Sequence, residues 1–411
     1  MIEEGFPPST DELRAWLRLG HANGIGPIRG RALLEHIGPP EAILEAGFAR
    51  VAEVLGSAAP ARALFHPDRQ RDERIAAALQ WQAGGASSRL ILTLSHPCYP
   101  SRLLDLADPP LLLYCVGDWR WLGQPQIAIV GSRNASLHGA GTAQALAAAV
   151  AAAGWTVTSG LAEGIDQAAH QGALAARGGS TIAALGTGIE RVYPARAHGL
   201  ARRIAGCGAL ISEQPIGSPP VPANFPRRNR LIAALSRAVL VVEAAPRSGS
   251  LITARLAADL GREVMAVPGS IHSPLARGCN ALIRQGAKLV DSADDILAEL
   301  PPVSRLGLRW TPGTAPMAGS PGLEIAPPAP HPSDEPAAAS GSAAMAKGLP
   351  DADLPEEQAR LLAVMSADPV MLETIAQRQR VPLSSALAAL QTLELIGLVQ
   401  RQLDGSYVRC P

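Results

Sequence analysis

The densest group of residues able to do chemistry is the run Asn224-Phe225-Pro226-Arg227-Arg228-Asn229-Arg230. It combines one aromatic ring with three guanidinium groups and two amides. Aromatic faces stack on unpaired bases, and arginines bind phosphates through paired N–H donors. Between positions 224 and 262 there are seven arginines and two acidic residues, a local net charge of +5. The run predicts contact with single-stranded nucleic acid. The alternative is that Phe225 packs at a helix start and the arginines are solvated.

Glycine, serine and arginine follow several short apolar runs in the same part of the chain. Gly131-Ser132-Arg133 comes after one run, Gly160 to Gly164 after another, and Arg247-Ser248-Gly249-Ser250 after a third. Glycine lets a backbone approach a ligand closely, and helix N-termini attract anions. These loops predict a phosphate-rich ligand.

Standard nucleotide motifs are missing from these loops. The first strand is followed by Gly131-Ser132-Arg133-Asn134 and not by the dinucleotide pattern G-x-G-x-x-G. The phosphate-binding pattern G-x-x-x-x-G-K-[ST] does not occur either. We therefore expect phosphate recognition without a nucleotide cofactor, and no cofactor of another kind.

A doubly wound sheet would bring these loops together. Between positions 90 and 300, short apolar runs alternate with amphipathic helical patterns, as in a mostly parallel Rossmann-like α/β sheet. The expected strands are 127–130, 156–158, 181–185, 210–212, 239–243, 264–267 and 289–290. The expected helices are 142–153, 165–177, 200–205, 227–236, 251–260 and 279–285. Ligands of such sheets bind beyond the carboxyl ends of the strands, where all these loops would lie.

Three other segments flank this α/β region of residues 90–300. Residues 1–65 predict a small helical domain, whose Gly24-Ile25-Gly26-Pro27 turn is similar to helix-hairpin-helix or SAM-like units. Such a turn can offer N–H groups to DNA phosphates, but a plain helix cap is the favoured explanation of one short motif. Residues 301–354 are rich in Pro, Ala, Gly and Ser, which is typical of a flexible linker. Residues 355–411 predict a second small domain.

Composition excludes several classes of protein. The 411 residues favour two or three domains, and 36 basic against 36 acidic residues give no overall charge that would attract DNA or membranes. The five cysteines are scattered and form no C-x-x-C pair, which argues against a zinc ribbon and a disulfide framework. No apolar run is long enough to cross a bilayer, and the first residues do not form a signal peptide. We expect a cytoplasmic protein without a membrane partner.

Other polar groups are weaker candidates for chemistry. Asp166 and His170 are four residues apart and could share a metal, but no third ligand is evident, so we expect no metal site. Glu163 with Asp166 could form an acid–base pair, although carboxylates at a helix start commonly cap it. Ser248 and Ser250 lack a nucleophile elbow. Glu243, which ends a strand near the loops, is the one carboxylate that stays a catalytic candidate.

Taken in order, the motifs of the α/β region resemble the bacterial DNA-processing protein A family, also called Smf. The matching runs are IAIVGSR, TSGLAEGIDQAAH, GTGIERVYP, ISEQPIGSPP, NFPRRNRLIAALS, VVEAAPRSGSLITA, REVMAVPGS and GCNALIRQGA. They span about half of the chain. One difference is that the family usually has Asn a few residues after Tyr-Pro, where this chain has Ala195-Arg196-Ala197-His198 after Tyr193-Pro194.

The resemblance implies a function as well as a fold. It implies a homodimer that binds single-stranded DNA, protects incoming DNA and loads the RecA recombinase during natural transformation, displacing or tolerating single-strand binding protein. It implies no catalysis. DNA contacts are expected at the residues of the three loops and of the basic aromatic run: Gly131, Ser132, Arg133, Gly160, Gly164, Asn224, Phe225, Arg227, Arg228, Asn229, Arg230, Ser248, Gly249, Ser250 and Thr253.

A different class of protein is the alternative. Gly-rich loops on such a sheet also resemble phosphoribohydrolases that cleave nucleoside monophosphates, which carry P-G-G-x-G-T-x-x-E with a catalytic glutamate. The corresponding loop here, from Arg247 to Ala254, has no glutamate after it. A nucleotide-processing enzyme would therefore need another carboxylate, such as Glu243 or Glu163.

The C-terminal segment resembles the winged-helix unit at the end of many members of the family. The patterns predict helices at 356–365, 372–378 and 384–395, then a wing turning at Asp404-Gly405. The helix at 384–395 has no Arg or Lys, and residues 355–411 contain five arginines and six acidic residues. Because a strong grip on DNA needs a basic face, a protein contact or an accessory role is at least as well supported as duplex-DNA regulation.

Overall fold

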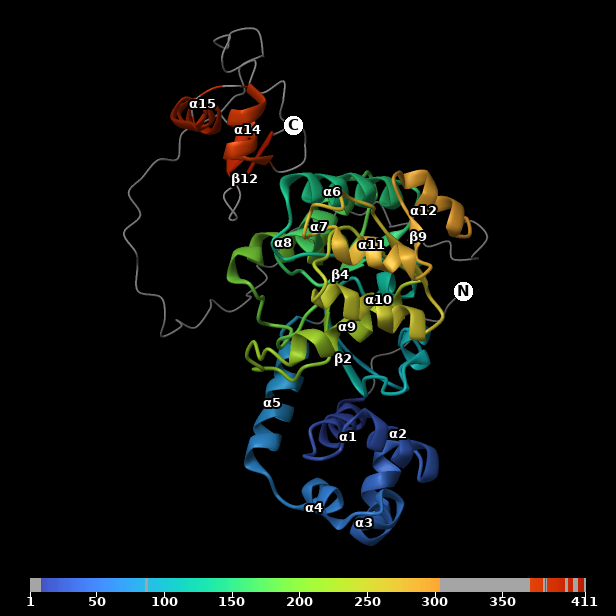
Figure 1. Cartoon of the computed structure of the whole chain (residues 1–411). Coiled ribbons are helices and arrows are strands. Elements are labelled where there is room, and N and C mark those ends of the chain that lie inside the picture. Colours follow the sequence, from blue (N-terminus) through green and yellow to red (C-terminus); the bar gives the residue numbers. More distant parts are fainter. Residues whose placement is uncertain are drawn as a thin grey trace, which may run out of the picture.

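The computed structural model describes residues 9–85, 88–303, 370–379, 381, 383–395, 398–401 and 406–409. The first helices, coloured blue in Figure 1, form a bundle at one end of the sheet domain. They are α1 (Thr10–Gly20), α2 (Pro27–His36), α3 (Pro40–Leu55), α4 (Ala58–Phe65) and α5 (Arg69–Ala83). Helix α5 continues the helical segment past position 65, where the sequence suggested its end. Its Ile75, Ala78 and Trp81 pack in the same core as Leu13 and Trp16 of α1.

A nine-stranded sheet forms the centre of the molecule. Its strands are β1 (Arg89–Thr93), β2 (Leu112–Gly117), β3 (Gln126–Val130), β4 (Thr156–Ser159), β5 (Thr181–Ala184), β6 (Ala209–Ser212), β7 (Ala238–Val241), β8 (Glu263–Ala266) and β9 (Lys288–Leu289). They are ordered β1-β2-β6-β5-β4-β3-β7-β8-β9. Strands β3 to β9 pair in parallel, whereas β2 is antiparallel to both β1 and β6. The sheet therefore confirms the extended Rossmann-like fold.

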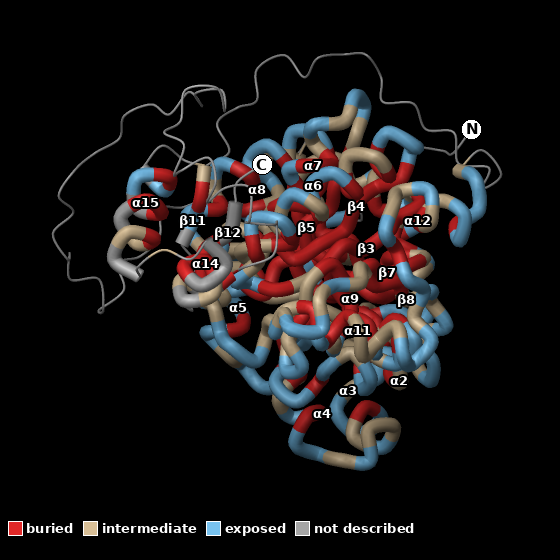
Figure 2. Tube along the Cα trace, turned by 45° about the horizontal axis from the view of Figure 1, so that its top comes forward, coloured by how far each residue is buried: buried red, intermediate tan, exposed pale blue. Residues whose placement is uncertain are grey.

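Helices cover both faces of this sheet, so its central strands are buried (Figure 2). On strand β3, Ile127 and Ile129 pack in one apolar core and Ala128 and Val130 in the other, because successive side chains point to opposite faces. The first face carries α6 (Leu137–Ala152), α7 (Ile165–Ala175), α8 (His198–Cys207) and α12 (Ala293–Glu299). The second carries α9 (Asn224–Leu235), α10 (Gly249–Asp259) and α11 (Arg277–Arg284). Three short 3-10 helices, η1 (Ser101–Asp105), η2 (Trp119–Gly123) and η3 (Ala195–Ala197), lie in the connections.

The strand order reverses direction at β3. From β3 the chain runs through β4 and β5 to β6 on one side, and it returns through α9 to add β7 on the other side. The connections leaving β3 and β7 therefore separate at their carboxyl ends and leave a crevice between them. This topological switch point is where open α/β sheets bind ligands.

A smaller unit follows near the C-terminus. It consists of β10 (Val370–Met371), α14 (Leu372–Gln379), α15 (Leu383–Leu395), β11 (Val399–Arg401) and β12 (Ser406–Arg409), with sheet order β10-β12-β11. Its core contains Ile375, Leu390, Leu393, Val399 and Tyr407. Two helices followed by a strand pair form the winged-helix arrangement expected from the sequence. The expected helix at 356–365, the linker beyond residue 303 and the turn at Asp404-Gly405 lie outside the described residues.

Among the described helices, none combines the length and the apolar character needed to cross a membrane.

Candidate nucleic-acid interface

A cavity of about 470 Å³ lies at the switch point of the sheet. We call it the carboxyl-edge cavity. Its walls come from the loops after β3, β4 and β7 and from the first turns of α9 and α10. It is lined by Val130, Gly131, Ser132, Arg133, Asn134, Ala162, Asp166, Arg228, Asn229, Ile232, Ala245, Arg247, Ser248, Gly249, Ser250 and Thr253. The fold thus brings together predicted residues that are more than a hundred positions apart in sequence.

Two exposed arginines from different loops line this cavity. Arg133 leaves the end of β3, and Arg247 precedes α10. Within the part of the chain that the structure describes, neither guanidinium has an ion pair or a hydrogen bond to protein. The carbon of the Arg133 guanidinium lies 5.7 Å from the centre of the Phe225 ring, a cation–π contact. Both guanidinium groups can therefore donate to an incoming phosphate.

The start of α10 adds further positive potential to the same wall. Ser248 is its N-cap, and the Ser248 hydroxyl accepts a hydrogen bond from the Ser250 backbone N–H at 3.3 Å. The two serine hydroxyls are 2.7 Å apart, and Thr253 lies buried one turn further on. Because the free N–H groups of a helix start carry partial positive charge, this turn favours an anion in the cavity.

Arg228 has a different position from the two exposed arginines. It is only 3% exposed, and its Nη1 donates to the carbonyl oxygens of Gly160, at 2.6 Å, and Ala184. The guanidinium therefore ties together the ends of β4 and β5. Burial lowers the pKa of Arg228 to about 10, while the nearby Asp166 carboxylate favours its charged form. This predicted phosphate ligand is thus part of the scaffold beneath the cavity.

Asp166 holds the loop that follows β4. Its Oδ2 accepts hydrogen bonds from the backbone N–H groups of Gly160, at 3.1 Å, and Ala162, at 3.4 Å. Burial raises the pKa of this carboxyl, and the Arg228 charge and the two N–H donors oppose the rise. At Gly164, φ is +76°, and a side chain there would come within 2.7 Å of the Arg133 carbonyl oxygen. Glycine at this position lets the two loops meet and orients Arg133.

The basic run at the start of α9 is divided between two faces of the helix. Arg228 and Asn229 face the carboxyl-edge cavity, and the Asn229 side-chain amide donates to the Gly249 carbonyl oxygen at 3.3 Å. Arg230 is 6% exposed and forms ion pairs with Glu213 and, at 3.3 Å, with Asp108. Glycines 160 and 164, Asn224, Phe225, Arg227 and Arg230 do not line the cavity.

The candidate catalytic side chains have structural partners. Glu243 accepts from the backbone N–H and the hydroxyl of Ser136 at 2.9 and 2.5 Å, where Ser136 caps α6. Glu163 forms an exposed ion pair with Arg196. His170 is fully buried, so its pKa falls to about 3, and its Nδ1 lies 2.7 Å from the Thr181 hydroxyl rather than beside Asp166. In the described residues no three His, Cys, Asp or Glu side chains converge to hold a metal ion.

Comparison with known proteins identifies the family. Residues 90–301 match DNA recombination-mediator protein A, and residues 345–405 match the DprA winged helix domain. The chain belongs to the DNA recombination-mediator protein A family. This confirms the resemblance stated from the sequence.

Individual relatives extend this assignment along most of the chain. It is 33% identical over 425 residues to Protein Smf of Synechocystis sp., an alignment covering 98% of this chain and 100% of that relative. It is 47% identical over 215 residues to Protein Smf of Escherichia coli, covering 52% of this chain and 56% of that relative. It therefore matches only about half the length of that relative. Among solved structures, DNA processing protein A from Streptococcus pneumoniae has a TM-score of 0.62 and 35% identity, covering 72% of this chain and 99% of that chain.

Sequence reasoning left three side chains of this interface out of the predicted contacts. Arg247 belongs to a loop that the sequence predicts to bind phosphate but is absent from the predicted DNA contacts, and Asp166 is a candidate only as a capping, acid–base or metal-binding group. Tyr193 was noted only as part of a family motif, although its ring lies 5.4 Å from that of Phe225. The scarcity of aromatics, at 3% of the chain, was the available signal for Tyr193.

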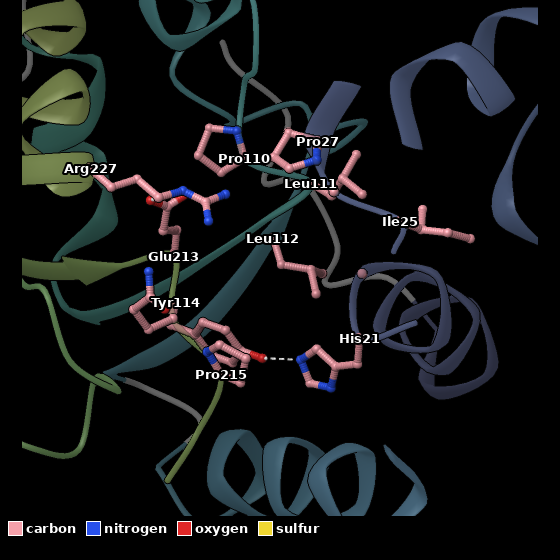
Figure 3. Close-up of a pocket in the computed structure, with 13 residues that line it drawn as sticks. His21, Ile25, Pro27, Pro110, Leu111, Leu112, Tyr114, Glu213, Pro215 and Arg227 are labelled. Atoms are coloured by element: carbon pink, nitrogen blue, oxygen red, sulfur yellow. Dashed lines mark hydrogen bonds and ion pairs between the residues drawn. The ribbon is translucent and has the colours of Figure 1, made fainter. Parts of the chain in front are cut away.

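A second cavity, of about 220 Å³, lies between the N-terminal helices and the edge of the sheet (Figure 3). We call it the inter-domain cavity. Its walls include Ile25, Gly26, Pro27, Leu111 and Leu112, so the Gly-x-Gly-Pro turn faces the sheet here. At its base His21 Nε2 lies 3.1 Å from the Tyr114 hydroxyl, and burial lowers the pKa of His21 to about 4.

The charged groups of the inter-domain cavity are paired. Arg227, on its rim, lies 3.7 Å from the Glu213 carboxylate, which also pairs with Arg230. Burial raises the pKa of Glu213, and both arginines favour its charged form. Because a buried carboxylate faces this cavity, an anionic ligand is disfavoured there.

Proposed function

We propose that the chain binds single-stranded DNA at the carboxyl-edge cavity and acts as a recombination mediator. The observation that carries this proposal is the pair of exposed, unpaired guanidinium groups of Arg133 and Arg247, which both line the cavity at the switch point. Two such groups about a helix N-terminus suit the phosphates of a strand that passes between them.

Single-stranded rather than duplex DNA suits this geometry. The cavity is a crevice between loops, too small for a double helix, and the exposed Tyr193 ring, packed on Phe225 at the Arg133 side, offers a face to an unpaired base. A duplex hides its base faces in the stack, so only the phosphate contacts would remain.

The proposal includes the wider role expected from the family. In it the chain protects incoming single-stranded DNA, loads RecA onto it during natural transformation, tolerates or displaces single-strand binding protein, and acts as a homodimer. The family description as a recombination mediator supports this role. The proposed role is binding without catalysis, since Glu243 and Asp166 are each held by hydrogen bonds of the scaffold.

The test is fluorescence anisotropy with a labelled oligo-dT across a salt series, with unlabelled duplex of equal length as competitor. Phosphate contacts predict a linear fall of log affinity with log salt, by about 0.7 per phosphate neutralised on a single strand. We expect the duplex to compete at least about tenfold less well, since stacking is worth about 1–3 kcal/mol per base.

Two results of this experiment would contradict single-stranded-DNA binding, and one further assay would favour the alternative. Absence of binding at low salt, or equal competition by duplex, would contradict the proposal. Release of free base from nucleoside monophosphates would instead favour the phosphoribohydrolase-like alternative.

A further inference from the structure

Three side chains from three separate connections meet beside the carboxyl-edge cavity. Phe225 begins α9, Tyr193 lies in the connection from β5 to α8, and Arg133 follows β3. The Phe225 and Tyr193 ring centres are 5.4 Å apart with an angle of 48° between the ring planes. The Arg133 guanidinium lies 5.7 Å from the Phe225 centre. The Tyr193 ring is therefore within about 11 Å of a guanidinium that lines the cavity.

Phe225 is largely occupied by protein contacts. Arg133 and Tyr193 lie against its ring, and Gly186 approaches it so closely that an added side chain would come within 2.9 Å of its Cδ1 atom. The residue is half-buried. Its ring thus serves mainly as a support for its two neighbours, and little of it remains for a base.

Tyr193 is the exposed member of this group. It keeps 47% of its surface exposed. Large exposed apolar surface on a folded protein is more informative than buried apolar surface, because folding normally buries it. Exposed aromatics are rare here because Phe, Trp and Tyr together make up only 3% of the chain. Tyr193 lies against the same Phe225 ring as the Arg133 guanidinium, and its exposed ring is placed to stack on a planar ligand.

The Tyr193 segment is held in place on both sides. Before it, the Thr187 hydroxyl donates to the Arg191 carbonyl oxygen at 2.5 Å, which closes the turn. After it, Arg196 pairs with Glu163 in the loop that follows β4. The ring is therefore attached to the loop that orients Arg133, so it can bind without first being ordered, which lowers the entropic cost.

We propose that Tyr193 forms a base-stacking subsite for one unpaired nucleobase, next to the phosphate held by Arg133. This inference rests on the proposed binding of single-stranded DNA at the carboxyl-edge cavity. The base stacks on the open face of Tyr193, Phe225 supports the ring from behind, and Arg133 holds the neighbouring phosphate. Since every base has an aromatic face, the subsite selects for single strands without selecting a sequence.

Two probes and three variants of the full-length chain test the subsite. The probes are a labelled oligo-dT and an oligonucleotide of equal length and charge in which abasic residues replace the bases. Tyr193→Leu keeps an apolar side chain against Phe225 but removes the aromatic face, whereas Tyr193→Phe keeps the face and removes the hydroxyl. Phe48→Ala, at a 42%-exposed aromatic of α3, is the matched surface control.

The subsite predicts a specific pattern of affinities. Tyr193→Leu should weaken binding of oligo-dT by about tenfold and leave binding of the abasic probe unchanged, because only the base contact is lost. Tyr193→Phe and Phe48→Ala should bind both probes as the unchanged chain does. Thermal unfolding of each variant confirms that the fold is intact.

Each other pattern overturns the subsite for a different reason. If the unchanged chain binds oligo-dT and Tyr193→Leu binds it equally well, DNA binding stands and the subsite is wrong. If Tyr193→Leu weakens both probes alike, Tyr193 acts on the position of Arg133 and not on a base. If the unchanged chain binds neither probe, the proposed function fails together with the subsite.

Discussion

The carboxyl-edge cavity and the inter-domain cavity both have an arginine of α9 on their walls, from adjacent positions. In the first, Arg228 is buried against backbone carbonyls, and the exposed arginines 133 and 247 are unpaired. In the second, the exposed Arg227 lies beside the carboxylate of Glu213. The second is lined by the Gly26-Pro27 turn, by Leu111 and Leu112 of the sheet edge and by the buried Glu213, whereas the first is lined by loops of Gly, Ser and Arg.

The difference shows that an arginine-rich run is not by itself a phosphate site. An arginine that faces a buried carboxylate stabilises the packing of two elements, and its charge is already neutralised. An arginine without a partner can exchange water for phosphate at little cost. The position of a guanidinium relative to the nearest carboxylate therefore separates the binding cavity from the structural one.

The largest expected effect is on the free energy of unfolding, and it distinguishes Arg228 from its neighbour Arg227 in α9. Arg228→Met should destabilise the chain by about 3–5 kcal/mol, because the buried Asp166 carboxylate loses the nearby positive charge that favours its ionised form. Two carbonyl oxygens, of Gly160 and Ala184, also lose their donor. Urea unfolding at neutral pH measures the loss.

Arg227→Met is the control for this measurement. Its side chain is 51% exposed, and its ion pair with Glu213 should contribute less than about 1 kcal/mol. Equal stability of the two variants would show that Arg228 does not hold the scaffold together.

A second, smaller effect is the loss of stability at acidic pH that comes from His21 in the inter-domain cavity. The pKa of His21 is lowered from 6.5 to about 4 in the folded chain, so the unfolded chain takes up a proton first as the pH falls. The stabilising effect of the neutral imidazole is therefore full above about pH 6.5 and is lost between that pH and about 4. His21 should account for about 2 kcal/mol of the stability lost between about pH 7.5 and about pH 5.

Urea unfolding at the two pH values tests this expectation. His21→Gln keeps a hydrogen-bonding group near Tyr114 and should lose less stability on acidification by about that amount. The same substitution at His66, an exposed histidine directly after α4, is the control for removing an imidazole. If His21→Gln loses as much stability between the two pH values as the unchanged chain does, His21 is not buried as a neutral group.

The smallest expected effect tests whether binding belongs to the sheet domain. A chain truncated after Val303 lacks the winged-helix unit, whose sequence from 355 to 411 has five arginines and six acidic residues. Its affinity for oligo-dT should change by less than about threefold, because that sequence has no net positive charge to attract the phosphates. A loss greater than about tenfold would place the main DNA contact in the winged helix, as the duplex-regulator hypothesis requires.

Most of the sheet could be predicted from the sequence because its central parallel strands are buried on both faces. Strands β3 to β9 were expected within two residues of where they lie, since strand and helical patterns alternate along this part of the chain. The edge strand β9 is an exception to the burial, because Lys288 and Leu289 are both exposed. Strands β1 and β2 were not expected. They pair antiparallel without an intervening α-helix, so the alternation of strand and helix gave no sign of them.

The sequence predicts the loops of the interface but not the separate positions of the α9 arginines, because those positions depend on contacts with distant strands. The loops 131–133 and 248–250 line the cavity, since the carboxyl ends of parallel strands share one edge. The separation of Arg228 from Arg227 and Arg230 depends on which face of α9 packs on the sheet. It also depends on Glu213, which lies at the end of another strand. Local sequence contains neither piece of information, and only the assembled fold shows which arginines are unpaired.

The most direct test of the account compares the unpaired arginines with the paired one. Binding of labelled oligo-dT across a salt series would be measured for Arg133→Ala with Arg247→Ala together, and for Arg227→Ala. We predict that the double variant binds at least about tenfold more weakly, with a salt slope smaller by about 1.4, as loss of two phosphate contacts requires. Arg227→Ala should stay within about twofold of the unchanged chain. Unchanged binding by the double variant, or an equal loss in Arg227→Ala, would contradict the assignment of DNA to the carboxyl-edge cavity.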